Sequence, residues 1–183
     1  GRRDRRHQLR AHRTGRVDNL EVEIKTKTGK QIPVLVSCEI IETIGKKYYL
    51  TVMSDVSEQK QTSELQSLLV KISETYINTP LETIKATINN SLQEIGLFVK
   101  ADRSYIFDYN WDDNTCNNTY EWCNEGVSAE IENLQQVPLE MLHDWVENHK
   151  NDRPMYVYDV EKLDDESCLK QILEPQGIKS LLT

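Results

Sequence analysis

The side chains best suited to chemistry in this sequence are its cysteines. Cys38, Cys116, Cys123 and Cys168 show no CxxC pair and no zinc-site spacing. No signal peptide opens the sequence, so we expect reduced thiols, with a Cys116–Cys123 disulfide across a hairpin as the alternative. The chain has no glycine-rich phosphate loop, zinc-protease motif or serine nucleophile elbow. The sequence therefore predicts no catalytic residue and no metal site, and it identifies no cofactor.

Aromatic side chains in the second half of the chain define a candidate ligand pocket. Residues 103–110 alternate as a strand, which places Tyr105 and Phe107 on one face. A hairpin mate follows and brings Trp122. With Asp159 at the end of a later strand, these residues could line a small-molecule site. The alternative is that the rings simply fill the core, since aromatic residues dominate ordinary cores.

The most specific local pattern is a joint between a strand and a helix. The apolar strand 48–54 ends at Asp55, and a polar helix follows. Asp55 and Glu58 form a capping box, in which Asp55 accepts from N–H groups of the first turn and Glu58 reaches back. We predict that Asp55 and Glu58 relay conformational change across this joint.

The helix beyond the joint carries one narrow apolar stripe. Its members, at spacings of three and four, are Leu65, Leu68 or Leu69, Ile72 and Tyr76. A stripe of this kind faces a single partner, so we predict a homodimer in which two copies of the helix pair in parallel.

Alternation and amphipathic spacing predict the remaining elements. Thr79 is expected to cap the second helix, with Glu82 at its third position. Strands are expected at 19–28, 31–43, 103–110, 118–124, 155–160 and 178–183, and helices at 2–13, 56–78, 81–98, 139–150 and before 173.

Charge is unevenly distributed along the chain. Seven arginines and one aspartate fall within residues 1–16, so the net charge of −8 comes from a strongly acidic remainder. An acidic body repels phosphates, and we expect no nucleic-acid partner. No apolar run approaches the roughly 20 residues of a spanning helix, so we also expect no membrane contact within this chain. The scattered cysteines without a secretory signal indicate a cytoplasmic location.

Residues 1–60 resemble the C-terminal half of a PAS domain. The resemblance rests on Asn-Leu-Glu before a strand, a Thr-Gly-Lys turn and the closing Asp-Val-Ser-Glu-Gln-Lys at 55–60. The last is similar to the Asp-Ile-Ser/Thr-Glu-Arg-Lys ending of that family, with Val56 and Gln59 as departures. The resemblance implies that Asp55 links the last strand to a signalling helix.

Residues 66–183 resemble the front two-thirds of a GAF domain. The segments EWCNEGVSAEIENLQQVPLEMLHDW and EPQGIKSLLT carry the likeness to GAF modules of bacterial sensory proteins. Some GAF domains attach bilin through Cys-His, but Asn117 and Asn124 follow Cys116 and Cys123 here. The Asn-Lys-X-Phe-Asp-Glu signature of cyclic-nucleotide-binding members is also missing.

Two further sites implied by family likeness involve histidines near the start of the chain. Ala-His-Arg-Thr-Gly around His12 is similar to the phosphoacceptor box of histidine kinases, but Arg13 stands in place of the acid, which disfavours phosphotransfer. Some PAS domains bind haem through such a helix, with His7 or His12 as the ligand. The segment is too polar for a haem pocket, and we expect surface histidines.

Together these features predict an α+β protein in three parts. Residues 1–56 would be the C-terminal half of a PAS domain with an antiparallel sheet, 57–79 a helical connector, and 80–183 a GAF-like antiparallel sheet flanked by helices and incomplete at its C-terminus. We expect a sensory input region that binds a small ligand or relays change to an output domain elsewhere, in a sensor histidine kinase of a two-component system. A diguanylate cyclase input region and a ligand-free dimerisation scaffold are the alternatives, and this segment itself is not expected to be an enzyme.

Overall fold

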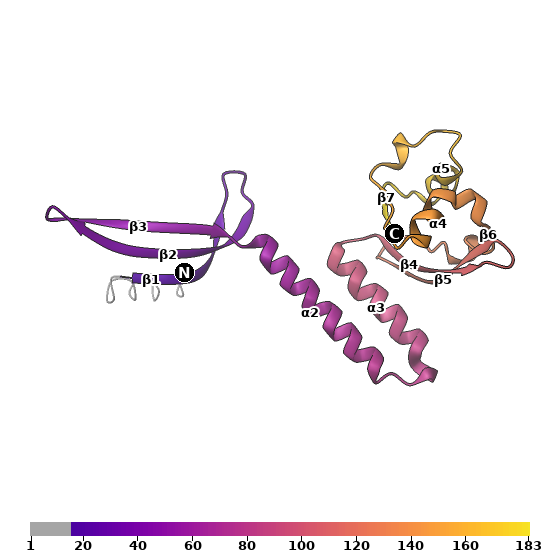
Figure 1. Ribbon diagram of the computed structural model, residues 1–183, viewed down its shortest axis with the longest axis horizontal. Helices are drawn as coiled ribbons and strands as arrows, with labels where there is room; N and C mark the ends of the chain where they lie inside the picture. Colours follow the sequence, from indigo (N-terminus) through magenta and orange to yellow (C-terminus); the bar gives the residue numbers. More distant parts are fainter. Residues whose placement is uncertain (1–15) are drawn as a thin grey trace. The chain divides into compact units, whose positions relative to one another are not determined.

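The computed structural model describes residues 16–183, and the chain forms two compact units, Gly1–Val70 and Lys71–Thr183. Within the described residues, small antiparallel sheets combine with four α-helices (Figure 1). This mixture agrees with the expected α+β class. The helix predicted at 2–13 lies outside the described residues, as do His7 and His12.

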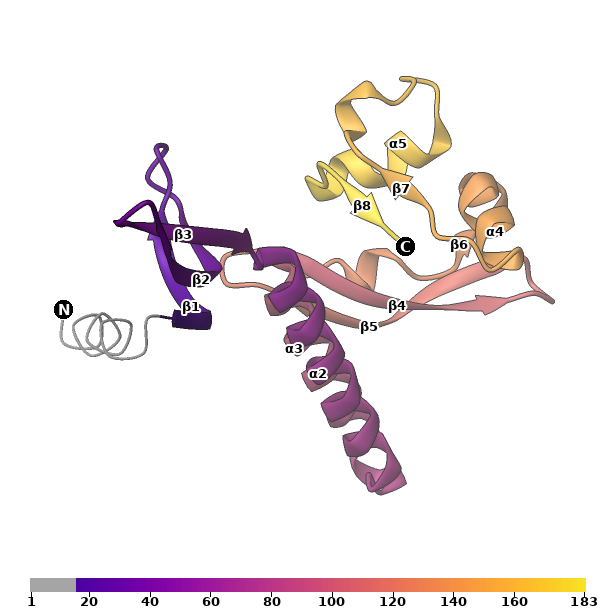
Figure 2. The same ribbon diagram turned by 60° about the vertical axis from the view of Figure 1, so that its left-hand side comes forward.

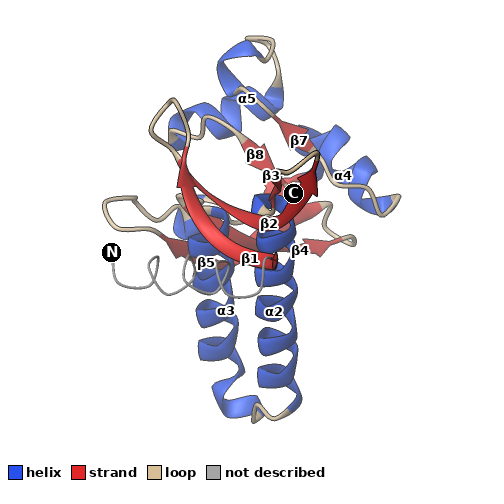
Figure 3. Cartoon of the chain, turned by 90° about the vertical axis from the view of Figure 1, so that its left-hand side faces the viewer, coloured by secondary structure: helices blue, strands red, loops and turns tan. Residues whose placement is uncertain are grey.

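A three-stranded antiparallel meander forms the sheet of the first unit. Its strands are β1 (Arg16–Lys25), β2 (Gln31–Thr43) and β3 (Lys46–Asp55), in the order β1-β2-β3, and Figure 3 shows them as curved red ribbons. Val22 pairs with Val34, which pairs in turn with Asp55. Alternation explains this register, because it turns the branched side chains of β1 and β2 to one face. The bounds of β2 are those predicted, while β1 and β3 begin earlier.

One long helix, α2 (Ser57–Ile77), follows β3. It has 21 residues, and none of its side chains is buried. Leu65 and Leu69 of the predicted stripe are 38% and 48% exposed. Most of the stability of a helix in a protein comes from the packing of its apolar face. The other members of the stripe, Leu68, Ile72 and Tyr76, are partly buried, so the described residues cover the stripe only in part.

The next helix begins with a 3-10 turn, η1 (Leu81–Thr83), and continues as α3 (Ile84–Val99). The prediction that Thr79 caps it is wrong. Pro80 occupies the cap position of η1 without a side-chain hydrogen bond, and the Thr79 hydroxyl instead donates to the Thr75 carbonyl at 2.6 Å. A threonine hydroxyl can bond backward to the preceding turn, which here withdraws it from capping.

The second unit contains the sheet β4 (Arg103–Asn110), β5 (Thr115–Cys123) and β6 (Val137–Pro138), in the order β4-β5-β6. The register of β4 against β5 shifts by one residue between Ile106 and Phe107. The helix α3 packs on one face of this sheet, where Gly96 lies against the Trp122 ring.

The remaining elements are short and lie on one side of the β4–β5 pair (Figure 2). The strands expected at 155–160 and 178–183 shrink to β7 and β8, which pair over only two residues each. The other residues of those two segments form turns and irregular structure. In chain order the elements are η2 (Ile131–Asn133), η3 (Leu139–Leu142), α4 (His143–Lys150), β7 (Tyr156–Val157), η4 (Val160–Lys162), α5 (Cys168–Leu173), η5 (Glu174–Gln176) and β8 (Leu181–Leu182).

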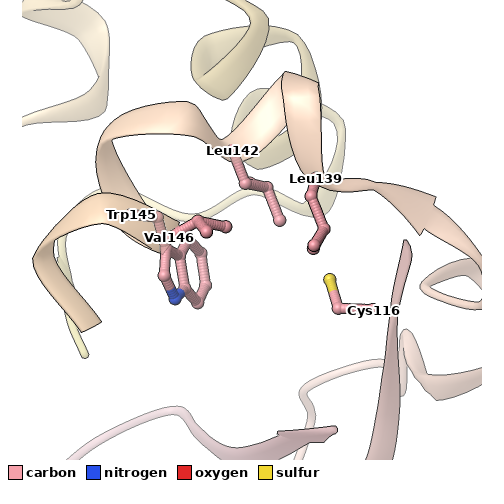
Figure 4. Close-up of a cluster of buried hydrophobic side chains, with 5 residues drawn as sticks. All are labelled: Cys116, Leu139, Leu142, Trp145 and Val146. Carbon is pink, nitrogen blue, oxygen red and sulfur yellow. The ribbon is translucent and has the colours of Figure 1, made fainter. Parts of the chain in front are cut away.

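A compact apolar cluster fastens α4 to the sheet. Four side chains from η3 and α4 point toward Cys116 of β5, namely those of Leu139, Leu142, Trp145 and Val146 (Figure 4). Each of the five is at most 7% exposed. Burial of side chains of this size contributes about 1.5–3 kcal/mol each, so this cluster is a principal source of stability for the second unit.

The substitution Gly96→Ala tests how closely α3 approaches the sheet. A Cβ at residue 96 would overlap the Trp122 ring carbons Cε3 and Cζ3. Such overpacking costs about 1–3 kcal/mol, whereas the same change at an exposed helical position gains about 0.5–1 kcal/mol. We expect urea denaturation followed by circular dichroism to show a lower free energy of unfolding. The matched control is Asn90→Ala on the exposed side of α3, which should leave the free energy of unfolding unchanged or slightly higher. If Gly96→Ala has the same free energy of unfolding as the parent protein, the close approach of α3 to the sheet is contradicted.

Candidate functional site

The joint between β3 and α2 is held by hydrogen bonds on both sides of the chain. The Val56 N–H donates to the Pro33 carbonyl at 3.1 Å, which ties the residue after β3 to β2. One residue earlier, Asp55 Oδ1 accepts from the Ser57 N–H at 2.8 Å. Val56 is buried, so its side chain anchors the start of the helix. The sheet thus fixes both the position and the direction in which α2 begins.

The charge of Asp55 is matched to this role. Hydrogen bonds from the Ser57 side chain and then from its backbone N–H lower the pKa of the Asp55 carboxyl. The ionised form is the better acceptor for these donors, so it is favoured in the folded state. An aspartate that accepts from the N–H two residues on forms an Asx turn, a common start for a helix.

The second half of the predicted capping box is not seen. The Glu58 side chain is exposed and makes no hydrogen bond within residues 16–183. The Asx turn at Asp55 places the start of α2 at Ser57. Of the two predicted relay residues, Asp55 therefore holds the joint, while Glu58 only adds negative charge to the first turn, where the helix dipole favours it.

Tyr105 and Phe107, two of the residues proposed for a ligand pocket, line a narrow hollow in the second unit. The opposite walls come from α4, α5 and the segment leading to β8, including Trp145, Ile172 and Gln176. The free volume is about 10 Å³, room for at most one water molecule. The rings therefore fill most of the interior in this conformation.

The other two predicted pocket residues lie elsewhere. Trp122 pairs with Ser104, on the face of the sheet that meets α3. Asp159 precedes η4, where its carboxylate accepts from the Glu161 N–H at 3.2 Å and contacts Lys162 Nζ at 2.8 Å. The Lys162 bond is the main cause of the lowered pKa of Asp159. Neither side chain lines the hollow behind Tyr105.

A buried arginine next to the hollow was not anticipated from the sequence. The Arg103 side chain is 8% exposed, and its Nη2 lies 3.8 Å from Glu130 Oε1. Its Nε donates to the Ser128 carbonyl at 2.9 Å and its Nη1 to the Gln176 carbonyl at 3.2 Å. Arg103 lies two residues before Tyr105, and residues two apart lie on the same face of a strand. The alternation of the sequence could therefore have indicated that this arginine faces inward.

A second hollow, of about 660 Å³, lies between the β4–β5 turn and α4. Its charged lining residues include Asp113, Glu140, Glu147 and Lys150, all of them exposed. Exposed charges remain hydrated and hold a ligand weakly. This surface therefore offers little that would bind a small molecule.

Residues 16–183 were also compared with the requirements of a metal site and of a reactive thiol. No group of three or more His, Cys, Asp or Glu side chains in that range is placed to hold a metal ion. The four cysteines are free thiols, and burial raises the pKa of Cys116 to about 11. None of the helices in the described part of the chain is long and apolar enough to cross a membrane.

A histidine at the end of α4 joins three elements. His149 Nδ1 lies 3.2 Å from Trp145 Nε1 and 2.7 Å from the Tyr109 hydroxyl, while Nε2 lies 2.9 Å from Thr183 Oγ1. An indole N–H can only donate, so Nδ1 must be an unprotonated acceptor. Burial also lowers the pKa of His149. The neutral ring is therefore the form that connects α4 to β4 and to the end of β8.

The stability of the protein should fall in mild acid because of His149. The unfolded chain takes up this proton near the ordinary pKa of 6.5, whereas the folded protein takes it up only at lower pH. The free energy of unfolding should decrease as the pH falls from 7 through 6.5 and level off below the folded pKa. Thermal melts across this range should show that His149→Gln removes part of the slope.

The matched control is His143→Gln, because the His143 side chain is 76% exposed on the same helix. That variant should keep the slope of the parent protein. Equal slopes for His149→Gln and the parent protein would show that His149 makes no contribution.

No protein-family model matches the chain, and a search of the curated proteins found none similar to it. The function is therefore argued from the residues and contacts of this chain. Its best-defined feature is the joint at Asp55, where a paired strand passes directly into a long exposed helix.

Proposed function

We propose that the chain is a sensory input region of a bacterial signal-transduction protein. In this proposal residues 1–56 are the C-terminal half of a PAS domain, 57–79 a signalling helix and 80–183 a GAF-like domain. The observation that carries it is the joint at Asp55. Because β3 is paired with β2 as far as Asp55 and α2 starts two residues later, a change in the sheet alters the geometry at which the helix begins.

Exposure of α2 supports a partner for the helix. None of the 21 residues of α2 is buried, and Leu65 and Leu69 of its apolar stripe are exposed. Pairing two copies in parallel would cover both stripes and turn a local change at the joint into a rotation or register shift of the pair. A homodimer through α2 is therefore part of the proposal.

The output of the parent protein belongs to the same proposal. We place catalysis outside this chain, in a histidine kinase domain of a two-component system, with a diguanylate cyclase as the alternative output. A cytoplasmic location and the absence of nucleic-acid and membrane partners are consistent with the acidic charge of the chain.

A ligand-free dimerisation scaffold is the second candidate function. The observation that favours it is the free volume of only about 10 Å³ behind Tyr105 and Phe107. Native mass spectrometry of the purified chain separates the two. A small molecule retained by the purified chain supports a sensor. A mass equal to that of the protein alone supports the scaffold.

The substitution Asp55→Ala tests the relay in the complete signalling protein. Loss of the acceptor frees the Ser57 N–H and loosens the connection between β3 and α2. We expect the response of the output activity to its signal to fall by about fivefold or more, the lower range of allosteric coupling.

Two variants serve as controls for the relay. Asp55→Asn keeps an oxygen that can accept from Ser57 and should retain most of the response. Glu58→Ala removes a side chain without hydrogen bonds in the described structure and should leave the response unchanged. If Asp55→Ala responds like the parent protein, the joint is not the transmitter.

The substitution Leu69→Glu tests the dimer. A carboxylate at the centre of the stripe would be buried against its own copy across a parallel pair, and such burial is strongly unfavourable. We expect the parent chain to be a dimer at micromolar concentration by light scattering and the Leu69→Glu variant to be a monomer.

The matched control is Gln66→Glu, which adds the same charge beside the stripe and should leave the dimer intact. Circular dichroism would confirm that both variants fold. A monomeric parent chain at these concentrations would overturn the proposed dimer.

A further inference from the structure

The buried arginine described above is the centre of a polar corner formed by β4, β5, the 128–131 segment and η5. Glu121 of β5 joins it through Oε2, which accepts from the N–H groups of Glu130 and Ile131 at 2.9 Å each. Glu130 in turn faces Arg103, and its side chain is 15% exposed. One guanidinium therefore shares this corner with two carboxylates.

The other titratable groups of the corner are a phenol and a thiol. Burial is the main cause of the raised pKa of both Tyr105 and Cys123, so neither group adds a charge at physiological pH. The corner thus brings two carboxyl groups to a single guanidinium. A further cation would give these carboxyl groups a charged donor.

Several polar atoms around the corner have no partner within the described residues. Glu121 Oε1 and Gln176 Oε1 are buried and accept no hydrogen bond, and neither side-chain atom of Asn118 is bonded. Asn118 is 1% exposed. Native proteins leave few such groups unsatisfied, and each one requires an explanation.

Two of these residues, Glu121 and Asn118, lie on the face of the sheet that carries Tyr105 and Phe107, and the third, Gln176, lies in η5. Glu121 pairs with Tyr105 and Asn118 pairs with Phe107, so both follow their partners onto that face. Gln176 itself lines the hollow, together with Tyr105 and Phe107. Three of the four unpartnered atoms are acceptors, so an occupant should mainly donate.

We propose that this corner binds a small organic ammonium ion, which donates to Glu121 Oε1 and Gln176 Oε1 and extends an apolar group toward Tyr105 and Phe107. The proposal deepens the sensory function and rests on it for its biological role. A cation supplies the missing donors, whereas an anion would meet two carboxyl groups. Aromatic rings beside the site also favour a cation.

Binding requires the hollow to widen, and the wall that can move is η5. The Arg103 bond to the Gln176 carbonyl holds this wall in place. Gly177, with φ +68°, follows directly and provides a backbone position suited to a change of direction. Gln176 Oε1 has no partner in this arrangement, so an ammonium that bonds to it from a widened hollow would favour an open position of η5, and the structure described here would be the closed form.

The experiment uses the purified chain and three probes of one shape. Phenethylamine carries the ammonium, 2-phenylethanol is its neutral counterpart and phenylacetate its anionic one. Isothermal titration calorimetry should show binding of phenethylamine, at least roughly tenfold weaker binding of the alcohol and none of the acid, because a charge-assisted hydrogen bond would be lost.

Two variants locate the site. Glu121→Gln and Gln176→Met should each weaken binding of phenethylamine roughly tenfold or more. Gln176→Met provides an independent test if Glu121→Gln does not fold. The matched control Glu132→Gln removes an exposed carboxylate from η2 and should bind like the parent chain.

Two results would overturn the proposal. One is equal binding of the amine and the alcohol, and the other is no binding of any probe by a folded parent chain, which would assign the unpartnered atoms to ordered water. Neither result bears on α2. The relay and the dimer would stand or fall with the Asp55 and Leu69 variants alone.

Discussion

The hydrogen bond from the Ser57 N–H to the Asp55 carboxylate is the constraint on which the proposed function depends. It lies where a strand paired to its last residue passes into a helix with no buried side chain. The Val56 N–H adds a second tie to β2, so the helix has little freedom at its origin. A sheet and a helix joined through a flexible loop would lack these two fixed contacts between strand and helix.

The second unit is organised differently, with the β4–β5 pair packed on both faces. The apolar cluster around Trp145 covers one face, and α3 approaches the other closely enough that Gly96 cannot carry a Cβ. The polar corner at Arg103 interrupts the first face. Apolar packing on one side of Tyr105 and unpartnered polar atoms of the described residues on the other are the combination on which the proposed ligand site rests.

Periodicity predicted most elements from the sequence, because alternation and helical spacing reflect burial directly. The bounds of β2 and β4 agree with the prediction, and Asp55 lies where its cap was expected. Of the residues proposed for the pocket, Trp122 faces away from the hollow because of one residue of register. Without the shift between Ile106 and Phe107, Trp122 would pair with Arg103 and face the hollow, but the extra residue turns it toward α3. No local pattern reveals such a shift, and the polar corner was hidden because its members are distant in sequence.

A nearly closed hollow is compatible with a sensor on energetic grounds. If the closed form dominates without ligand, the measured affinity is reduced by the fraction of open molecules, and binding reports on a change of conformation. A wide, preformed pocket would bind more tightly but would change the protein less. In the proposal, Glu121 and Glu130 would provide the differential interaction that such a shift needs, because an ammonium would stabilise only the arrangement in which it can reach them. The same two carboxyl groups would then make the open form responsive to a cation.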